Sequence, residues 1–194
     1  MNNYVTGSAI RALREQKGYT QKQLAERLLV SDKAVSKWES GRGLPDISLI
    51  EPLAKTLGVS VAELLSGEYV QNRNRHGNML KSRFYVCPVC GNAMFATGEG
   101  AFSCCGVSLP PLEPEEPDEA HEIRTERIED EHYVRLDHPM DKTHYISFLA
   151  FVTADRVQFV KLYPEQNAEA RFHLSGRGVL YALCNRHGLF KKKI

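Results

Sequence analysis

The sequence predicts a multidomain chain with three successive parts: an all-α bundle, a small metal-bound knuckle and an antiparallel β-sandwich. Three observations lead to this prediction. Apolar residues recur at helical spacing over residues 8–66. Four cysteines then follow between Cys87 and Cys105. From residue 121 onwards, short runs of β-branched and aromatic residues alternate with turn signals.

The charge pattern indicates where these parts meet. The formal net charge of the 194 residues is only +1. Residues 71–83 nevertheless carry four basic side chains and no acidic one, whereas residues 84–120 carry six acidic side chains and no basic one. Such a change of sign is typical of a boundary. We predict a helical domain at 5–68, a linker at 69–83, a metal-binding knuckle at 84–112 and a β-sandwich at 113–194.

No segment has the pattern of a signal peptide or of a membrane span. The longest apolar stretch, near Tyr145–Val152, is interrupted by Ser147 and is far too short to cross a bilayer. We therefore expect a cytoplasmic protein. In a reducing compartment, the five cysteines favour metal ligands over disulfides.

The helical part contains start and stop signals at regular intervals. Gly18 ends the first helix, and Thr20 with Gln23 forms a capping box at the start of the second. Ser31 caps a third helix, and Asp46 opens a fourth. A short fifth helix follows. The apolar residues expected at helical spacing are Ile10, Leu13, Leu24, Ala25, Leu28, Val35, Trp38, Ile47, Ile50, Leu53, Leu57, Val61, Leu64 and Leu65.

The run TQKQLAERLLVSDKAVSKWESGRGLPD resembles the helix-turn-helix of the phage-repressor (Cro-like, Xre-type) family. The resemblance implies that the third helix enters the major groove of double-stranded DNA, and that the protein is a homodimer reading two half-sites. By position, the candidate base-reading residues are Asp32, Lys33, Ser36 and Lys37. The candidate phosphate contacts are Gln21 and Arg42. The alternative is a helical bundle that uses these charges only as a solvated face.

Bulk charge does not explain DNA binding by this part. Residues 5–68 contain nine basic and eight acidic side chains, a net charge of only +1. Affinity for DNA must therefore come from the placement of charges or from dimerisation.

The cysteine spacing predicts a metal site. Cys87 and Cys90 form a CxxC knuckle followed by Gly91, and Cys104 and Cys105 are adjacent. The pattern CxxCGN…CCG resembles desulforedoxin, which implies one iron held by four thiolates. Thiolates also bind zinc, so iron and zinc both stay possible. A disulfide between the adjacent cysteines is the other alternative.

The last part is predicted to be a set of short strands joined by turns such as Asp155-Arg156, Pro164-Glu165 and Ser175-Gly176. The expected strands are Tyr145–Thr153, Val157–Tyr163, Ala170–Leu174 and Val179–Cys184.

Two segments of this part, HPMDKTHYI and CNRHGLF, resemble the superoxide reductase family (neelaredoxin and desulfoferrodoxin). The resemblance implies an immunoglobulin-like sandwich and an iron held by four equatorial imidazoles and one axial thiolate. The motifs assign three of the imidazoles to His138, His144 and His187, and the thiolate to Cys184. For the fourth imidazole, His121 fits the family pattern better than His132.

The family's activity is the one-electron reduction of superoxide to hydrogen peroxide, with electrons from a donor such as a rubredoxin-like protein. By resemblance, Glu119 closes the ferric site at rest. The lysine that attracts superoxide in the family is replaced here by Ala120, and Lys142 is a candidate for the missing charge. The sequence therefore predicts a superoxide reductase with a DNA-binding domain. The alternative is a transcriptional regulator that uses the iron centre as a redox sensor without turnover.

Overall fold

The computed structural model describes residues 7–173 and 176–194, which form two compact units that divide after Gln71. Val5 and Thr6, at the start of the predicted helical domain, and Leu174 and Ser175, in a predicted strand and turn, lie outside the described residues. Among the described residues, no helix is long and apolar enough to cross a membrane.

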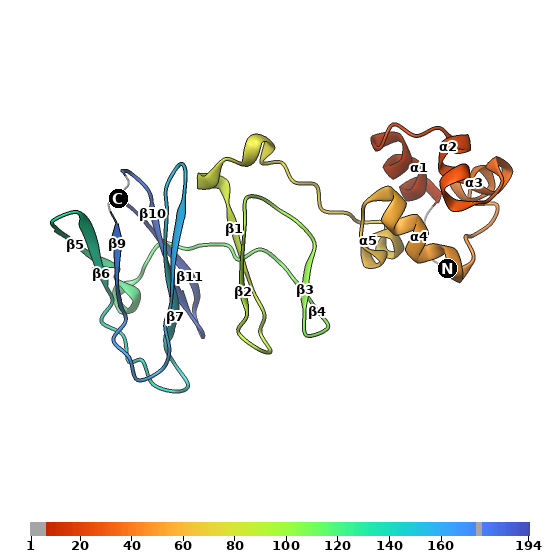
Figure 1. Cartoon of the computed structure of the whole chain (residues 1–194). Helices are drawn as coiled ribbons and strands as arrows, with labels where there is room; N and C mark the ends of the chain where they lie inside the picture. The colour runs from red at the N-terminus through yellow and green to blue at the C-terminus, as the bar shows by residue number, and fades with distance from the viewer. Residues whose placement is uncertain (1–6, 174–175) are drawn as a thin grey trace. The chain divides into compact units, whose positions relative to one another are not determined.

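The first unit is all-α, as the sequence predicted (Figure 1). Its helices are α1 (Gly7–Gln16), α2 (Gln21–Leu28), α3 (Asp32–Glu39), α4 (Ile47–Leu57) and α5 (Val61–Ser66). The predicted capping box is present, because the Thr20 hydroxyl accepts from the Gln23 backbone N–H at 3.1 Å and the Gln23 side chain accepts from the Thr20 N–H at 2.9 Å. Ser31 caps α3 in the same way, accepting from the Ala34 N–H at 3.2 Å.

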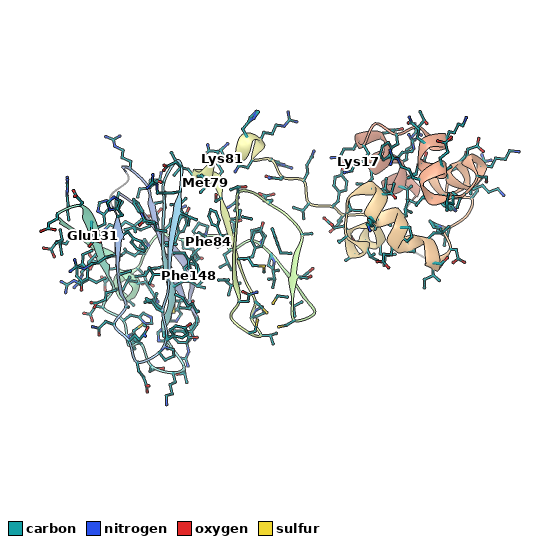
Figure 2. The ribbon with its side chains drawn as sticks, viewed as in Figure 1. Lys17, Met79, Lys81, Phe84, Glu131 and Phe148 are labelled. Carbon is teal, nitrogen blue, oxygen red and sulfur yellow. The ribbon has the colours of Figure 1, made fainter. Side chains whose placement is uncertain are left out.

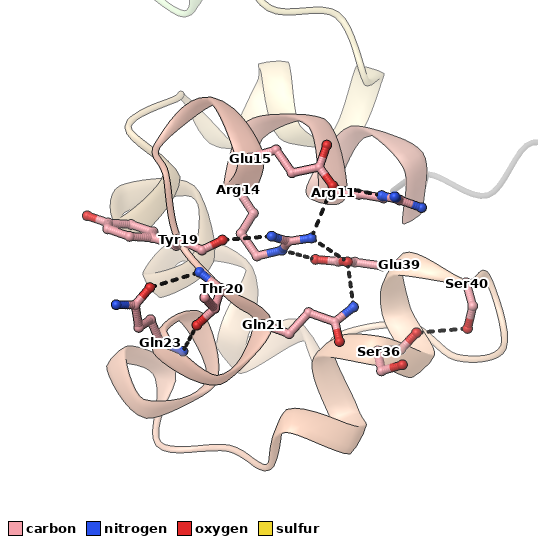
Figure 3. Close-up of polar contacts among 10 residues, drawn as sticks. All are labelled: Arg11, Arg14, Glu15, Tyr19, Thr20, Gln21, Gln23, Ser36, Glu39 and Ser40. Carbon is pink, nitrogen blue, oxygen red and sulfur yellow. Dashed lines mark hydrogen bonds and ion pairs between the residues drawn. The ribbon is translucent and has the colours of Figure 1, made fainter.

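One buried ion pair holds α1 to the end of α3. The Arg14 guanidinium donates to both Glu39 carboxylate oxygens, at 2.6 and 3.0 Å, and to the Tyr19 carbonyl at 2.7 Å (Figure 3). Gln21 donates to the same carboxylate at 2.8 Å. The Arg14 and Glu39 side chains are only 10% and 4% exposed. This network ties α1, α2 and α3 together above the apolar core that surrounds Trp38.

The second unit contains four antiparallel sheets. The hairpins β1 (Arg83–Val86)–β2 (Ala93–Ala96) and β3 (Phe102–Cys104)–β4 (Val107–Leu109) carry the cysteines. The predicted sandwich consists of a three-stranded and a four-stranded sheet (Figure 1). The three-stranded sheet has the order β5 (Arg124–Ile128), β6 (Glu131–Arg135), β9 (Glu169–His173). The four-stranded sheet has the order β11 (Gly188–Lys193), β10 (Val179–Cys184), β7 (Ile146–Val152), β8 (Val157–Lys161).

Strand β7 is buried on both of its faces. Leu149 and Phe151 point into the core between the two sandwich sheets, whereas Phe148 and Val152 belong to a second core on the opposite face. In this second core, Phe84 from β1 packs on Phe148 with ring centroids 5.3 Å apart (Figure 2). Every residue of β7 is buried, which explains why its sequence is apolar apart from Ser147 rather than alternating between apolar and polar residues.

The predicted linker at 69–83 differs from the observed chain. From Asn72 onwards the segment belongs to the β unit, and Asn74 is buried. The Asn74 side-chain amide donates to the Asn78 and Thr97 carbonyls, so this polar stretch is fixed by side-chain hydrogen bonds that a composition argument does not detect.

We predict that Arg14→Ala destabilises the helical unit by about 3 kcal/mol, because it leaves the Glu39 carboxylate buried and without its cation. Trp38 is the only tryptophan of the chain and lies in the core of this unit, so its fluorescence during urea unfolding reports on these helices alone. Arg11→Ala is the control, since it removes an exposed Arg–Glu pair from the same helix. Equal unfolding midpoints for the two variants would contradict the role assigned to the buried pair.

Candidate metal centres and nucleic-acid interface

The four predicted cysteine ligands meet at one place. The sulfur atoms of Cys87, Cys90, Cys104 and Cys105 all lie within 4.8 Å of one another, and all four thiols are free. A tight turn brings Cys87 and Cys90 together, since the Gly91 N–H donates to the Cys87 carbonyl at 2.9 Å with Gly91 at a φ of 68°. The sulfurs of Cys104 and Cys105 are 3.9 Å apart, so the adjacent cysteines form no disulfide in this structure.

The electrostatics of this cluster fit a bound cation. Backbone N–H groups, that of Cys90 first, lower the pKa of Cys87 to about 7. The neighbouring sulfurs, that of Cys90 first, raise the pKa of Cys105 to about 12. Four sulfurs in contact cannot all ionise unless a positive charge lies between them. The donor set therefore fits iron or zinc in a four-thiolate site.

Four imidazoles of the sandwich form a ring. Going round it, the ring centroids are separated by 5.4 Å (His121–His138), 4.4 Å (His138–His144), 4.8 Å (His144–His187) and 4.9 Å (His187–His121). The diagonal from His121 to His144 is 6.5 Å, longer than every side. The four rings thus stand at the corners of a quadrilateral.

The Cys184 sulfur lies against two opposite corners of this quadrilateral. It is 3.7 Å from His138 Nε2 and 3.6 Å from His187 Nδ1. Two buried ring nitrogens, His138 Nδ1 and His144 Nε2, have no hydrogen-bond partner among the described residues. A buried imidazole nitrogen without a partner is costly unless a ligand such as a cation binds it. His144 Nε2 is such a nitrogen, and His138 faces the Cys184 sulfur with its other nitrogen, Nε2. The His/Cys donor set therefore fits iron.

His121 is held in place by two neighbours, Asp118, which lies outside the family motifs, and Phe190, the last residue of CNRHGLF. Asp118 Oδ1 is 2.6 Å from His121 Nδ1, and the same oxygen accepts from the His121 backbone N–H at 2.9 Å. Phe190 stacks on the opposite side of the ring, at 4.2 Å and an interplanar angle of 17°. Because Nδ1 is occupied by Asp118, Nε2 is the nitrogen of His121 that faces the other imidazoles, 3.0 Å from His187 Nδ1.

The two segments HPMDKTHYI and CNRHGLF are clamped to each other. Asn185 accepts from the Tyr145 N–H at 2.9 Å and donates to the Thr143 carbonyl at 3.0 Å. Arg186 Nε donates to the same carbonyl at 3.0 Å. These bonds fix the turn after β10 against the loop before β7. Asn185 therefore sets the spacing between His144 and Cys184, a role that the sequence did not reveal.

Burial keeps His138 and His144 in the form that binds metals. It is the largest cause that lowers the pKa of His138 to about 4, and the charges of the neighbouring imidazoles add to it. The pKa of His144 is lowered for the same first reason, with contributions from His187 and Arg186. Neutral imidazole is the ligating form.

Other residues singled out by the sequence lie apart from the ring or at its edge. His132, on β6, packs edge-on against Phe151 and is not a member of the cluster. Glu119 is exposed, and its side chain has no hydrogen bond or ion pair within the described part of the chain. Lys142 pairs with Glu165 at 3.6 Å, which neutralises part of the charge that it was expected to supply.

Helix α3 presents an exposed polar face. The side chains of Asp32, Lys33, Ser36 and Lys37 are exposed, as is Arg42 after the helix, whereas Val35 and Trp38 are buried. Gln21 differs, because one of its amide protons is bonded to Glu39 and only the other is left for a phosphate (Figure 3). The DNA contacts of all six residues stay predictions.

Comparisons with known proteins agree with this division. The helix-turn-helix family model matches residues 10–64, and the desulfoferrodoxin family model matches residues 113–193. A desulfoferrodoxin homolog from Archaeoglobus fulgidus is 34% identical over 116 residues, which cover 55% of this chain and 93% of that protein. The chain belongs to the desulfoferrodoxin family.

Relatives of the helical unit lie outside the desulfoferrodoxin family. The HTH-type transcriptional activator BcrR of Enterococcus faecalis is 49% identical over 101 residues, 44% of this chain and 50% of that protein. The chain thus spans about half the length of BcrR, and 47% of a desulfoferrodoxin from Clostridium acetobutylicum. The superoxide reductase of Treponema pallidum shares the desulfoferrodoxin fold with a TM-score of 0.53, covering 59% of this chain and 99% of that chain at 21% identity.

We predict that Asp118→Ala weakens iron binding at the imidazole ring by about 10–100-fold, because His121 loses the partner that orients it. Competition with a chelator, followed by metal analysis, measures the change. Asp118→Asn should recover part of the affinity, since an amide oxygen still accepts from the ring. Glu122→Ala is the control, as its carboxylate pairs with Arg124 instead. An unchanged affinity in Asp118→Ala would refute the positioning role.

We predict that Lys33→Ala or Lys37→Ala weakens specific DNA binding by about 1–3 kcal/mol, because each removes a base contact from α3. Lys55→Ala, which removes the same charge from an exposed position on α4, is the matched control. Binding to operator fragments selected from random duplexes, compared at two salt concentrations, measures the effect. If Lys55→Ala lost as much affinity as the α3 variants, the assignment of α3 as the reading helix would be wrong.

Proposed function

We propose that the protein is a superoxide reductase that carries its own sequence-specific DNA-binding domain and acts as a homodimer on double-stranded DNA. The observation that supports this proposal is the ring of four imidazoles with the Cys184 sulfur against two of its corners. A donor set of four imidazoles and one thiolate matches the iron site of the superoxide reductase family. We propose His121, His138, His144, His187 and Cys184 as the ligands.

Iron held by these residues would supply, in its ferrous form, the single electron that together with two protons converts superoxide to hydrogen peroxide. The chain's own residues set the conditions for that step. Cys184 is buried, so its sulfur is shielded from water, and as a thiolate ligand it would donate electron density to the metal. Asp118 and Phe190 fix the orientation of His121. We assign to the exposed Glu119 carboxylate the closing of the ferric site at rest, and the electron is returned by a donor such as a rubredoxin-like protein.

The test uses the full chain, loaded with iron and reduced under anaerobic conditions. Superoxide pulses should oxidise the ferrous site and yield one hydrogen peroxide per iron oxidised, and added reductant should allow further cycles. Cys184→Ser should abolish the thiolate-to-ferric absorption of the oxidised protein. Survival of that absorption would exclude Cys184 as a ligand, and absence of superoxide-driven oxidation would exclude the activity.

A second candidate function is a redox-sensing transcriptional regulator. Two observations favour it: Ala120 stands where the family has a lysine, and the iron domain is fused to a helix-turn-helix unit. In this case the ferrous and ferric proteins should differ in DNA affinity, and oxidation by superoxide should stop after one equivalent even when reductant is present. Continuing turnover with equal DNA affinity in both states would favour the enzyme.

We predict that Ala120→Lys raises the second-order rate with superoxide by roughly threefold or more at low salt, because a cation beside His121 attracts the anion. The gain should shrink as salt screens the field. Ala154→Lys is the matched control, since this exposed alanine lies beyond the opposite end of β7 from His144. A rate that rises equally in both variants would show that net charge, and not position 120, is responsible.

A further inference from the structure

A second candidate site contains none of the residues of the metal clusters. It is formed where the start of the β unit meets β1, β10 and β11. It is a cavity of about 410 Å³, which we call the basic cavity. Its cationic lining residues are Arg73, Lys81, Arg83, Lys191 and Lys193, and its acidic one is Glu99. Five positive charges against one negative charge around a single cavity are unusual in a chain whose net charge is +1.

Most of these cations lack a protein partner. Within residues 7–173 and 176–194, the side chains of Arg73, Lys81, Lys191 and Lys193 make no hydrogen bond or ion pair. Arg83 makes only two long ion pairs, each at 3.5 Å, with Glu99 and Glu113. Like charges around one cavity repel one another, and a bound anion removes that repulsion.

The strand β11 separates two kinds of lysine. Lys191 and Lys193 share the face of Leu189, which packs in the core containing Phe84 and Tyr181. Lys192 points to the other side and donates to the Ile123 carbonyl at 2.6 Å. Because successive side chains of a strand point to opposite faces, Lys192 has a backbone partner on one face of β11, whereas Lys191 and Lys193 face the cavity on the other.

Hydroxyl groups on the cavity wall are also without partners. Ser82 Oγ is buried and has no hydrogen-bond partner among the described residues. Tyr181 also lines the cavity and its hydroxyl makes no hydrogen bond with any described residue, but Ser82 Oγ is the buried one of the two hydroxyls. A buried hydroxyl is normally bonded, so an unbonded one at the edge of a cavity indicates a ligand that completes it.

The other wall of the cavity is apolar and is formed by Leu80, Phe84, Leu112, Val179 and Leu189 (Lys81 and Phe84 are labelled in Figure 2). A volume of about 410 Å³ lies within the range of small-molecule sites. Ammonium and guanidinium groups together with hydroxyl donors match the oxygens of a phosphate group. We propose that the basic cavity binds a small phosphorylated molecule of nucleotide size, with its phosphates at the lysines and its ring system on the apolar wall.

The test is calorimetric titration of the full, metal-loaded chain with ADP, with inorganic pyrophosphate and with uncharged adenosine. ADP should bind more tightly than pyrophosphate, and adenosine should bind weakest. Lys191→Ala/Lys193→Ala should weaken ADP binding by about tenfold or more, since two charge-assisted hydrogen bonds are lost. Lys192→Ala, on the same strand but on the other face, should leave ADP affinity within about twofold.

Ser82→Ala gives a second readout that does not depend on charge. It should weaken ADP binding without lowering the thermal midpoint of the ligand-free protein, because the hydroxyl it removes has no partner there.

Four outcomes would overturn the proposal. They are no binding of ADP or pyrophosphate at millimolar concentration, equal affinity for these two probes, equal loss in the Lys192→Ala control, and binding of a DNA duplex but not of ADP through Lys191 and Lys193. Because anions that bind at the metal centres are unaffected by the two lysines, the double variant also separates the cavity from those centres.

Discussion

The β unit depends on one constraint, the burial of the β7–β10 layer on both faces. Phe151 and Leu149 fill the sandwich core, while Phe148 and Val152 pack under the β1–β2 hairpin with Phe84. Close packing on two sides leaves this layer little freedom to shift. Strand β10 of this layer ends at Cys184, and strand β7 begins at Ile146, two residues after His144. The rigid centre of the fold is therefore also the support of the imidazole ring.

The ring itself combines this rigid support with three loops. His121 comes from a short helical turn, His138 and His144 from the loop before β7, and His187 from the turn after β10. Loops hold a defined geometry only when their own polar groups are bonded. Asp118, Asp141 and Asn185 supply these hydrogen bonds, since each bonds to a backbone or imidazole atom in a segment that carries one of the four histidines. They position the imidazoles without being part of the donor set.

The sequence was sufficient for the order of the parts, the capping of α2 and α3, and the existence of strands β7 to β10. It missed β5, in which Arg124, Thr125, Glu126 and Arg127 are all exposed, so that no alternation of apolar and polar residues marks the strand. The residues around His132 in β6, by contrast, already looked like a strand. The sequence also missed β11, whose lysines divide between two faces. The motifs identified which histidines approach Cys184, and their ligation stays a proposal. Asp118 gave no signal because the family motifs do not include it, although it lies only three residues before His121. The partners of Asn185 are 40 and 42 residues away and follow only from the folded geometry.

The burial of β7 on both faces also determines how this chain can be rearranged. The helical unit ends at Gln71 with its own core, so exchange of that unit for another reader leaves the β unit intact. The cysteine module has no such independence, because its loss would expose Phe148, Val152 and Tyr181 as one apolar surface on an otherwise folded sheet. Exchange at the first junction keeps both cores covered, whereas separation at the second would leave an apolar sheet face exposed, which favours aggregation.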